Sequence, residues 1–435
     1  SDPTNGNTGF DTDSNTSTDS NTDTGADTHG DTDTETVTDT GTDTDTDSET
    51  TGDTDSGAVP RIDGFFVQPS LGYGATSFDR FSSQQEYTDW VQTMKDAGAT
   101  MLFYQWTMHY WHNQTWFSDA YGEPSSADFA FYDTTLEPLE GIAARAWVTP
   151  TSWPGAPSTG GKEPVEYLLD AGQAAGVEIW LGLYLCEDDN AFNWWQAVAD
   201  TDLTEEDVAI IDYHMARSVE VVDELYEKYG DHPALGGFYY SVEVENVAFI
   251  PDTNTTLLAA LLDYVADAVH AHDPQLRLAI SPFFNTALST PEEFGAMWHY
   301  ALSNSDIDVV ILQDGAGVDP FTLTDNTDLI SPFFEAMAGA ASASGKELWG
   351  NAELFTNLGT RLAPQFVPGS IAQLERQLTA EAPFVEKFVC FGFQYMDPHD
   401  DYVLTPPMGG DAATDATLRQ TLYDDYRGYL ETLKK

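Results

Sequence analysis

From Arg61 onward, short apolar runs alternate with longer segments whose apolar residues recur at the spacing of a helix. The short runs predict strands at residues 62–68, 100–106, 177–185, 235–243, 276–282, 307–313, 347–353 and 387–395. The longer segments predict helices at residues 84–97, 163–175, 203–229, 255–271, 291–303, 327–344, 370–382 and 414–432. Eight strand–helix units in succession predict an α/β fold, a (β/α)8 TIM barrel with enlarged loops after some strands.

Residues with known roles at helix ends support several of these boundaries. Gly98 and Gly176 follow the first two predicted helices, and a glycine at this position commonly ends a helix. Thr204 and Thr290 precede two others, where a threonine side chain can cap the first amides. Pro291 then stands at the first helical position, which tolerates proline.

The first 57 residues are a different kind of sequence, built from Asp-Thr, Asn-Thr and Gly-Asp-Thr repeats. Phe10 is the only large apolar residue before Val37, so this segment cannot bury enough apolar surface to offset the entropy of ordering. We predict a disordered acidic tether over residues 1–57 and one barrel domain over residues 58–435. Calcium binding by the Asp-x-Asp repeats is the alternative, but the ligand spacing of a calcium loop is missing.

The net charge restricts the classes of partner. The chain carries 73 acidic and 16 basic residues, a formal net charge of −57. Because 16 of the acidic residues lie in the first 60, the barrel has 57 acidic and 16 basic residues, or a net charge of −41. Such a surface repels nucleic acid and anionic lipid. We therefore expect no nucleic-acid partner, and a neutral or cationic substrate.

The compartment is predicted from the tether and the cysteines. No apolar run reaches 18 residues, so no membrane-spanning helix is predicted. Cys186 and Cys390 lie in apolar runs and are expected to be buried thiols. A Thr/Asp-rich stretch is typical of the spacer of an exported bacterial protein, so we expect a secreted or cell-surface tethered monomer. A lipid anchor upstream of residue 1 is a further hypothesis.

The alternation of side chains predicts which residues enter the barrel at the C-terminal ends of the strands, where barrel sites lie. On the fourth strand, Glu243 points inward at the end, with Tyr239 below it on the same face. On the seventh strand, Glu353 does the same, with Trp349 and Asn351 below it. Two carboxylates are therefore expected on opposite sides of the barrel mouth.

Two carboxylates at one mouth suit the cleavage of a glycosidic bond, which needs one protonated acid and one ionised carboxylate. Pairing of Glu243 or Glu353 with a cation is the alternative, but Lys and Arg are scarce and none lies beside either residue in sequence. Glu245 lies beyond the strand end and is predicted to contact substrate rather than to react.

Aromatic and polar residues are concentrated in the loops after the second and third strands and at the other strand ends. Apolar platforms edged by hydrogen-bonding groups are what sugar rings require. Packing against the barrel is the alternative for any single tryptophan. The predicted substrate-binding residues are Gln68, Gln105, Trp106, Trp111, Tyr184, Glu187, Trp194, Trp195, Tyr239, Glu245, Gln313, Asp314, Trp349, Asn351 and Tyr395.

Other catalytic motifs are weak or missing. Asp397, His399, Asp400 and Asp401 follow the eighth strand and could bind a cation, although a solvated loop is the simpler interpretation. The sequence has neither an H-E-x-x-H motif nor a cysteine pair for zinc, and no G-x-S-x-G elbow. We therefore predict no metal and no cofactor.

Several segments resemble a bacterial domain-of-unknown-function family of glycoside-hydrolase-type barrels. They are "GFFVQP", "MKDAGATMLFYQW", "GVEIWLGLYL", "YGDHPALGGFYYSVEVEN", "VVILQDGAGV" and "ELWGNAELF". The resemblance covers residues 62 to 395 and implies a (β/α)8 glycosidase-like fold with Glu243 and Glu353 at its acidic strand ends. The positions also resemble the retaining-glycosidase clan, which implies Glu243 as acid/base and Glu353 as nucleophile, although Val242 stands where that clan usually has Asn.

These observations predict a retaining glycoside hydrolase that cleaves a neutral or amino-sugar polysaccharide. Two alternatives stay open. A non-catalytic carbohydrate-binding barrel would use the same aromatic residues without needing Glu243. A metal-dependent polysaccharide-modifying enzyme would depend on the Asp/His residues after the eighth strand.

Overall fold

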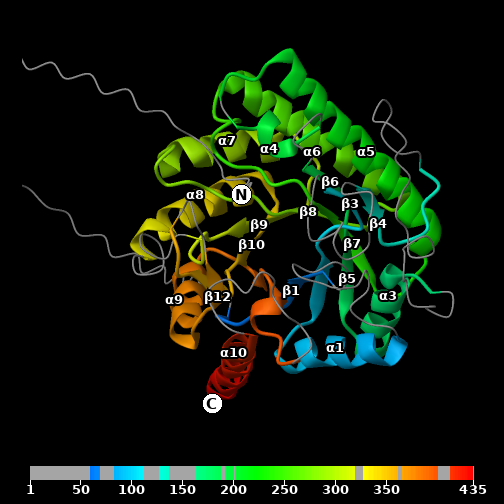
Figure 1. Ribbon diagram of the computed structural model, residues 1–435. Coiled ribbons are helices and arrows are strands. Elements are labelled where there is room, and N and C mark those ends of the chain that lie inside the picture. The colour runs from blue at the N-terminus through cyan, green and yellow to red at the C-terminus, as the bar shows by residue number, and fades with distance from the viewer. Residues whose placement is uncertain are drawn as a thin grey trace, which may run out of the picture. The chain divides into compact units, whose positions relative to one another are not determined.

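Eight parallel strands form the centre of the fold in this computed structural model (Figure 1). The structure describes residues 59–68, 83–111, 127–136, 162–187, 192–199, 201–318, 327–360, 365–399 and 412–434. The barrel strands are β1 (Gly64–Val67), β2 (Met101–Tyr104), β5 (Glu178–Gly182), β7 (Leu235–Tyr240), β8 (Leu278–Ile280), β9 (Val309–Gln313), β10 (Glu347–Asn351) and β13 (Val389–Cys390). Parallel bridges from Gly350 to Phe388 and from Glu353 to Phe391 join β10 to the β13 segment. The sheet thus closes, and the predicted barrel is confirmed.

Helices surround the barrel, as Figure 1 shows. They are α1 (Gln84–Asp96), α3 (Pro164–Ala175), α5 (Glu205–Tyr229), α6 (Asp252–His272), α7 (Pro291–Ser303), α8 (Ser331–Ser344), α9 (Ile371–Glu381) and α10 (Ala412–Leu433). Thr204 and Thr290 form the predicted caps, each accepting a bond from an amide of the first turn. The helix predicted over 327–344 is divided into η2 (Thr327–Leu329) and α8. Pro332 explains the break, since it has no amide hydrogen to continue a helix from the preceding turn.

Two small sheets extend the strand ends in a way that the sequence pattern did not predict. β3 (Met108–Trp111), β4 (Ala127–Ala130) and β6 (Tyr184–Glu187) form one, and β11 (Phe355–Asn357) pairs with β12 (Phe366–Pro368) in the other. The strand predicted over 177–185 therefore ends at Gly182, and β6 pairs with β3 instead. A Cβ at Gly182 would lie 2.3 Å from the carbonyl oxygens of Tyr104 and Gln105, so only glycine permits this close approach.

The barrel interior is a packed core, as expected for eight strands. Its buried side chains are Phe66, Met101, Phe103, Trp180, Tyr239, Ala279, Val309, Ile311, Trp349 and Val389. Phe103 stacks on Trp180 at 5.0 Å between ring centroids, and Trp349 meets Trp180 edge-on at 5.7 Å. The predicted inward direction of Tyr239 and Trp349 is confirmed, and both lie in this core. Cys186 and Cys390 are buried, as predicted.

A buried histidine ties α5 to β6. His214 is fully buried, and its Nδ1–H donates to the carbonyl oxygen of Ile210 at 3.0 Å. Its Nε2 accepts a bond from the amide of Cys186 at 3.2 Å. Only a neutral imidazole can donate through one nitrogen and accept through the other. Burial accordingly lowers the pKa of His214 from 6.5 to about 4.

We expect the free energy of unfolding to fall as the pH falls from 6.5 towards about 4, because there the unfolded chain protonates His214 and the native chain does not. The difference between these pKa values corresponds to about 3 kcal/mol. Urea unfolding of wild type and His214→Gln between about pH 4.5 and about pH 7.5 measures this contribution. His299→Gln, at an exposed position on α7, is the control. A loss of stability that runs in parallel in wild type and His214→Gln would contradict the assignment.

Candidate active site

Glu353 lies just beyond β10, at the C-terminal end of the barrel, and only 4% of its surface is exposed. Its Oε2 accepts hydrogen bonds from the backbone amides of Gly317 at 2.6 Å and Val318 at 3.0 Å. Its Oε1 makes no hydrogen bond to the described part of the chain. The carboxyl group is therefore held by one oxygen, and the other is available to a ligand.

The two amides come from a turn that follows β9 and is organised by Asp314. Oδ1 of Asp314 accepts bonds from the amides of Ala316 at 3.0 Å and Glu353 at 3.4 Å. Gly315 in this turn has a φ of 65°, which glycine adopts without strain. A Cβ at Gly317 would lie 2.9 Å from Oε2 of Glu353, so a side chain there would obstruct the carboxyl group. Asp314, predicted to bind substrate, is fully buried and holds this turn.

Glu243 lies beyond the end of β7, the fourth barrel strand, and is half-buried. Its Oε1 accepts a bond from Nε2 of Gln313 at 3.3 Å, and Gln313 also donates to the carbonyl oxygen of Ser281 at 2.8 Å. The indole N–H of Trp194 donates to the backbone oxygen of Glu243 at 2.5 Å. Gln313 and Trp194, from two other parts of the chain, thus hold Glu243 at this strand end.

The two glutamates lie in one electrostatic field. Burial raises the pKa of Glu353 well above its usual 4.5, and the negative charges of Asp314 and then Glu243 raise this pKa further. The amides of Val318 and Gly317 act in the opposite direction, because they stabilise the ionised form. The structure therefore brings Glu243 and Glu353 close enough for each to influence the ionisation of the other.

Hydrogen-bonded polar side chains at the strand ends lie beneath these carboxyl groups. Nδ2 of Asn351 donates to Oγ of Ser281 at 3.2 Å, and its Oδ1 accepts from the amide of Phe391 at 2.8 Å. Ser281 in turn donates to the carbonyl oxygen of Ile311 at 2.8 Å. Because Asn351 and Ser281 are buried, these bonds connect neighbouring strand ends out of contact with solvent. Asn351 supports the site from below.

Five predicted substrate-binding aromatics are exposed by 6% or less: Trp106, Tyr184, Trp194, Tyr239 and Trp349. Trp106 stacks on His109 at 4.4 Å, and Trp194 meets His214 edge-on at 5.3 Å. Packing, the alternative interpretation for single tryptophans, accounts for these positions. Because they are buried, they offer a sugar little surface.

Other predicted residues keep some exposure at the mouth: Gln68, Gln105, Trp195, Glu245 and Gln313 are half-buried. Both amide atoms of Gln68 are buried without a hydrogen-bond partner among the described residues. Tyr395 lies on η3 (Phe393–Tyr395), is 8% exposed and packs on Phe355 at 4.9 Å. The side chains of Trp111 and Glu187 lie outside the described residues, although their backbones are in β3 and β6.

The Asp/His cluster after the eighth strand has a structural arrangement in the part that is described. Asp397 is fully buried, and its Oδ2 accepts from the indole N–H of Trp90 at 2.8 Å. Its Oδ1 pairs with Nδ1 of His399 at 2.6 Å. Arg419 donates to the carbonyl oxygens of both residues at 3.0 Å. Asp397 thus joins α1 to α10, and Asp400 and Asp401 lie outside the described residues.

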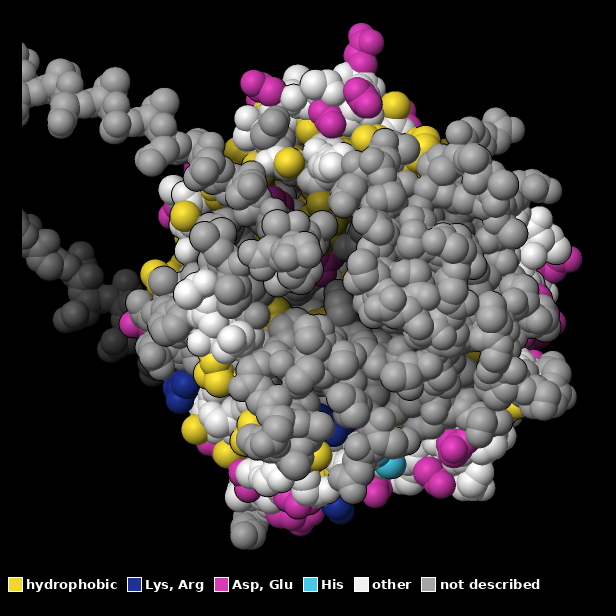
Figure 2. Space-filling view, viewed as in Figure 1, with side chains coloured by type: hydrophobic (Ala, Val, Ile, Leu, Met, Phe, Trp, Pro, Cys, Tyr) yellow, Lys and Arg dark blue, Asp and Glu magenta, His cyan; other side chains and the backbone are white. Residues whose placement is uncertain are grey.

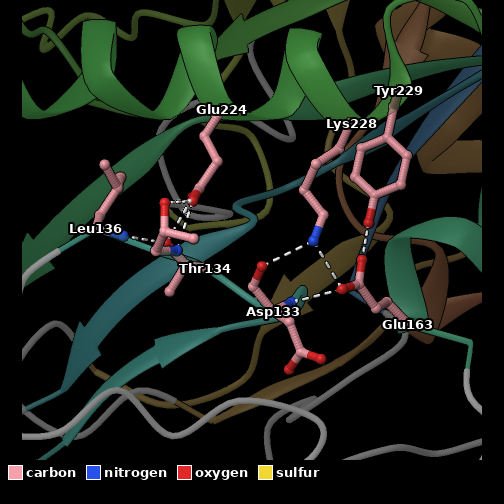
Figure 3. A network of polar contacts seen from close by, with 8 residues as sticks. Asp133, Thr134, Leu136, Glu163, Glu224, Lys228 and Tyr229 are labelled. Atoms are coloured by element: carbon pink, nitrogen blue, oxygen red, sulfur yellow. Dashed lines mark hydrogen bonds and ion pairs between the residues drawn. The ribbon is translucent and has the colours of Figure 1, made fainter.

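A groove of about 690 Å³ lies apart from these strand ends, between α3 and the end of α5. Nζ of Lys228 donates to the carbonyl oxygen of Asp133 at 2.7 Å and to Oε1 of Glu163 at 2.9 Å. The hydroxyl of Tyr229 donates to the other oxygen of Glu163 (Figure 3). These bonds join the start of α3 to the end of α5, so the polar groups of the groove hold the two helices together.

Sequence reasoning missed two residues on α9 that contribute to the site. Nε2 of Gln377 donates to Oδ2 of Asp314 at 2.5 Å and to the carbonyl oxygen of Glu353 at 3.2 Å. Glu381, at the end of α9, is also fully buried. The sequence does indicate that they face the core. Gln373, Gln377 and Glu381 follow one another at four-residue spacing on the helix face that also carries buried leucines.

Fold and site together define a (β/α)8 barrel with paired glutamates beyond the fourth and seventh strands. The chain belongs to the family described as Domain of unknown function (DUF4434), which it matches over residues 62–402. No curated protein matches it. Among the described helices, none is both long and apolar enough to cross a membrane.

Two solved structures share the fold. One is described as "a putative alpha-L-fucosidase" from Bacteroides thetaiotaomicron VPI-5482, with a TM-score of 0.56, 16% identity, and coverage of 86% of this chain and 96% of that one. The other is the endo-beta-1,4-mannanase from Thermotoga petrophila, with a TM-score of 0.50, 11% identity, and coverage of 86% and 77%. At these identities the similarity establishes the architecture.

Proposed function

We propose that this protein is a glycoside hydrolase in which Glu243 and Glu353 together cleave a glycosidic bond. The observation that carries the proposal is the pair itself, two carboxyl groups beyond opposite barrel strands in one electrostatic field. One of them is oriented by two backbone amides. The names of the two structural neighbours, a fucosidase and a mannanase, support the same chemistry.

We assign Glu353 as the nucleophile and Glu243 as the acid/base. The pair disfavours two negative charges, so one proton is retained between them over a range of pH. The amides of Gly317 and Val318 favour the negative charge on Glu353. In this assignment Glu243 carries the proton while Glu353 is ionised, and the raised pKa of Glu353 moves that state to higher pH.

The reaction proceeds in two steps that together retain the anomeric configuration. Oε1 of Glu353 attacks the anomeric carbon while Glu243 gives its proton to the departing glycosidic oxygen. Glu243 then removes a proton from water, which attacks the glycosyl–Glu353 ester and frees the carboxylate.

The proposed substrate is a neutral or amino-sugar polysaccharide. In Figure 2, acidic side chains are visible in the hollow near the centre of the face, and few of the coloured side chains are Lys or Arg. A uronic or sulfated glycan would be repelled by this charge. The buried amide of Gln68 and the half-buried Gln105 and Trp195 are suited to sugar hydroxyls and a ring face. Because a Thr/Asp-rich tether is typical of exported proteins, we also propose that the protein is exported.

The test is digestion of a glycan panel that contains neutral, amino-sugar and uronic polysaccharides, with reducing ends measured. We expect wild type to release sugar from a neutral or amino-sugar glycan, with and without EDTA, and the double variant Glu243→Gln/Glu353→Gln to release none. Binding without cleavage by wild type would favour the carbohydrate-binding barrel. Loss of activity in EDTA would favour the metal-dependent alternative.

A further inference from the structure

Glu381 is a buried carboxyl group that the reaction does not use. It is the last residue of α9, and its side chain is fully buried against the backbone of β10. A Cβ at Gly350 would lie 2.8 Å from Oε2 of Glu381, so the glycine makes room for the carboxyl group. No Lys or Arg in the described part of the chain acts on it. An ionised carboxylate in this position would be very costly.

Glu381 lies beside Asp314, because Gln377, one turn earlier on α9, donates to Oδ2 of Asp314 at 2.5 Å and the charge of Asp314 acts on Glu381. Two carboxyl groups share a hydrogen bond only when one of them carries a proton. Asp314 already accepts bonds from Nε2 of Gln377 and from the amides of Ala316 and Glu353, all of which stabilise a negative charge. Neither oxygen of Glu381 accepts a bond from the described residues. A hydrogen bond between the two carboxyl groups therefore needs the proton on Glu381, with Asp314 as the acceptor.

A hydrogen bond from Glu381 to Asp314 would influence the orientation of Glu353 through two steps. It adds a further donor to Asp314, which binds the amide of Ala316 inside the turn and the amide of Glu353 itself. The same turn supplies the Gly317 and Val318 amides that orient Glu353. Loss of this donor would leave the buried carboxylate of Asp314 with one hydrogen bond fewer. The turn that Asp314 holds would then be less well ordered.

We propose that Glu381 is a positioning residue: as a neutral carboxylic acid it fixes Asp314, and through Asp314 the turn that orients Glu353. This inference rests on the proposed role of Glu353. The titratable groups that face Glu381 are Asp314 beyond β9, Glu353 beyond β10 and Cys390 on β13. Each of these groups is either negatively charged, which disfavours ionisation of Glu381, or neutral. None of them therefore favours an ionised Glu381.

Kinetics of three variants test the positioning role. Gln also donates to Asp314, so Glu381→Gln should keep kcat within about threefold of wild type, whereas Glu381→Leu should lower kcat by about tenfold or more with KM little changed. Glu375→Gln, at an exposed position on the same helix, is the control for a Glu-to-Gln replacement outside the site. Equal impairment by Gln and Leu, or an unchanged kcat in Glu381→Leu, would overturn the proposal.

A second measurement does not depend on catalysis or on the folding of the Leu variant. Burial, and then the charge of Asp314, raise the pKa of Glu381 above its usual 4.5. As the pH rises from 4.5, the unfolded chain releases this proton and the native chain keeps it, so wild type loses stability. The Tm of Glu381→Gln relative to wild type should therefore increase with pH, whereas that of Glu375→Gln should not.

The two measurements separate the possible failures. Parallel Tm curves for wild type and Glu381→Gln would show that Glu381 is not held neutral and would overturn the inference. An inactive wild type with diverging Tm curves would instead refute the proposed hydrolase and the positioning role with it, while leaving the buried proton established.

Discussion

Glu353→Gln is expected to lower kcat on the cleaved glycan by about 10³-fold or more while the protein stays folded. An amide cannot attack the anomeric carbon, so the covalent step is lost. The same change should alter the free energy of unfolding only slightly, because it replaces a buried acid whose pKa is raised by burial and by the charge of Asp314. Steady-state kinetics with thermal unfolding as a folding check measure both effects.

The matched control is Glu347→Gln, on the same strand. Glu347 lies at the opposite end of β10, where it pairs with Arg277 at 2.9 Å. Its replacement should leave kcat nearly unchanged. In wild type, the acidic limb of kcat/KM should lie above pH 4.5, because Glu353 must ionise and its pKa is raised. An equally active Glu353→Gln, or equal losses in both variants, would refute the nucleophile assignment.

Glu243→Gln is expected to lower kcat on the glycan by about 10²- to 10⁴-fold, since the departing oxygen would leave without its proton. For an aryl glycoside whose leaving group needs no proton, the rate of the first step should fall by a smaller factor. Hydrolysis of the glycosyl ester would then limit turnover, because the water has lost its base. A burst of released aryl alcohol and acceleration by azide, which attacks without a base, are the readouts.

The two variants should therefore differ in how their activity depends on the leaving group of the substrate. Glu353→Gln should be poor on activated and natural substrates alike, and azide should not restore the same intermediate. If Glu243→Gln loses the same factor on both substrates and shows no burst, Glu243 is not the acid/base. If the pattern is reversed between the two variants, the roles of Glu243 and Glu353 must be exchanged.

The barrel and the placement of both glutamates could be predicted because the signals are local. Alternation along a strand assigns Glu243 and Glu353 to the same face as the buried Tyr239 and Trp349, whatever the rest of the chain does. The helix ends at Thr204 and Thr290 are likewise set by one side chain and a nearby amide.

The state of the aromatic residues could not be predicted in the same way. Trp106, Tyr184 and Trp194 read as candidate sugar platforms, yet their burial depends on β3, β6 and α5, which come from distant parts of the chain. β3 pairs with β6 through residues far apart along the chain, such as Met108 and Tyr184, so no local pattern predicts it.

The sequence by itself therefore determined the strand–helix order, the closed barrel and the two inward carboxyl groups, because periodicity acts over neighbouring residues. Only the tertiary structure decided what surrounds those groups: the amides of Gly317 and Val318 on Glu353, and the burial of Glu381 beside Asp314. Hydrogen bonding and ionisation depend on distance and burial in space. Asp314 and Glu381 lie far apart along the chain and meet only when α9 packs against β10.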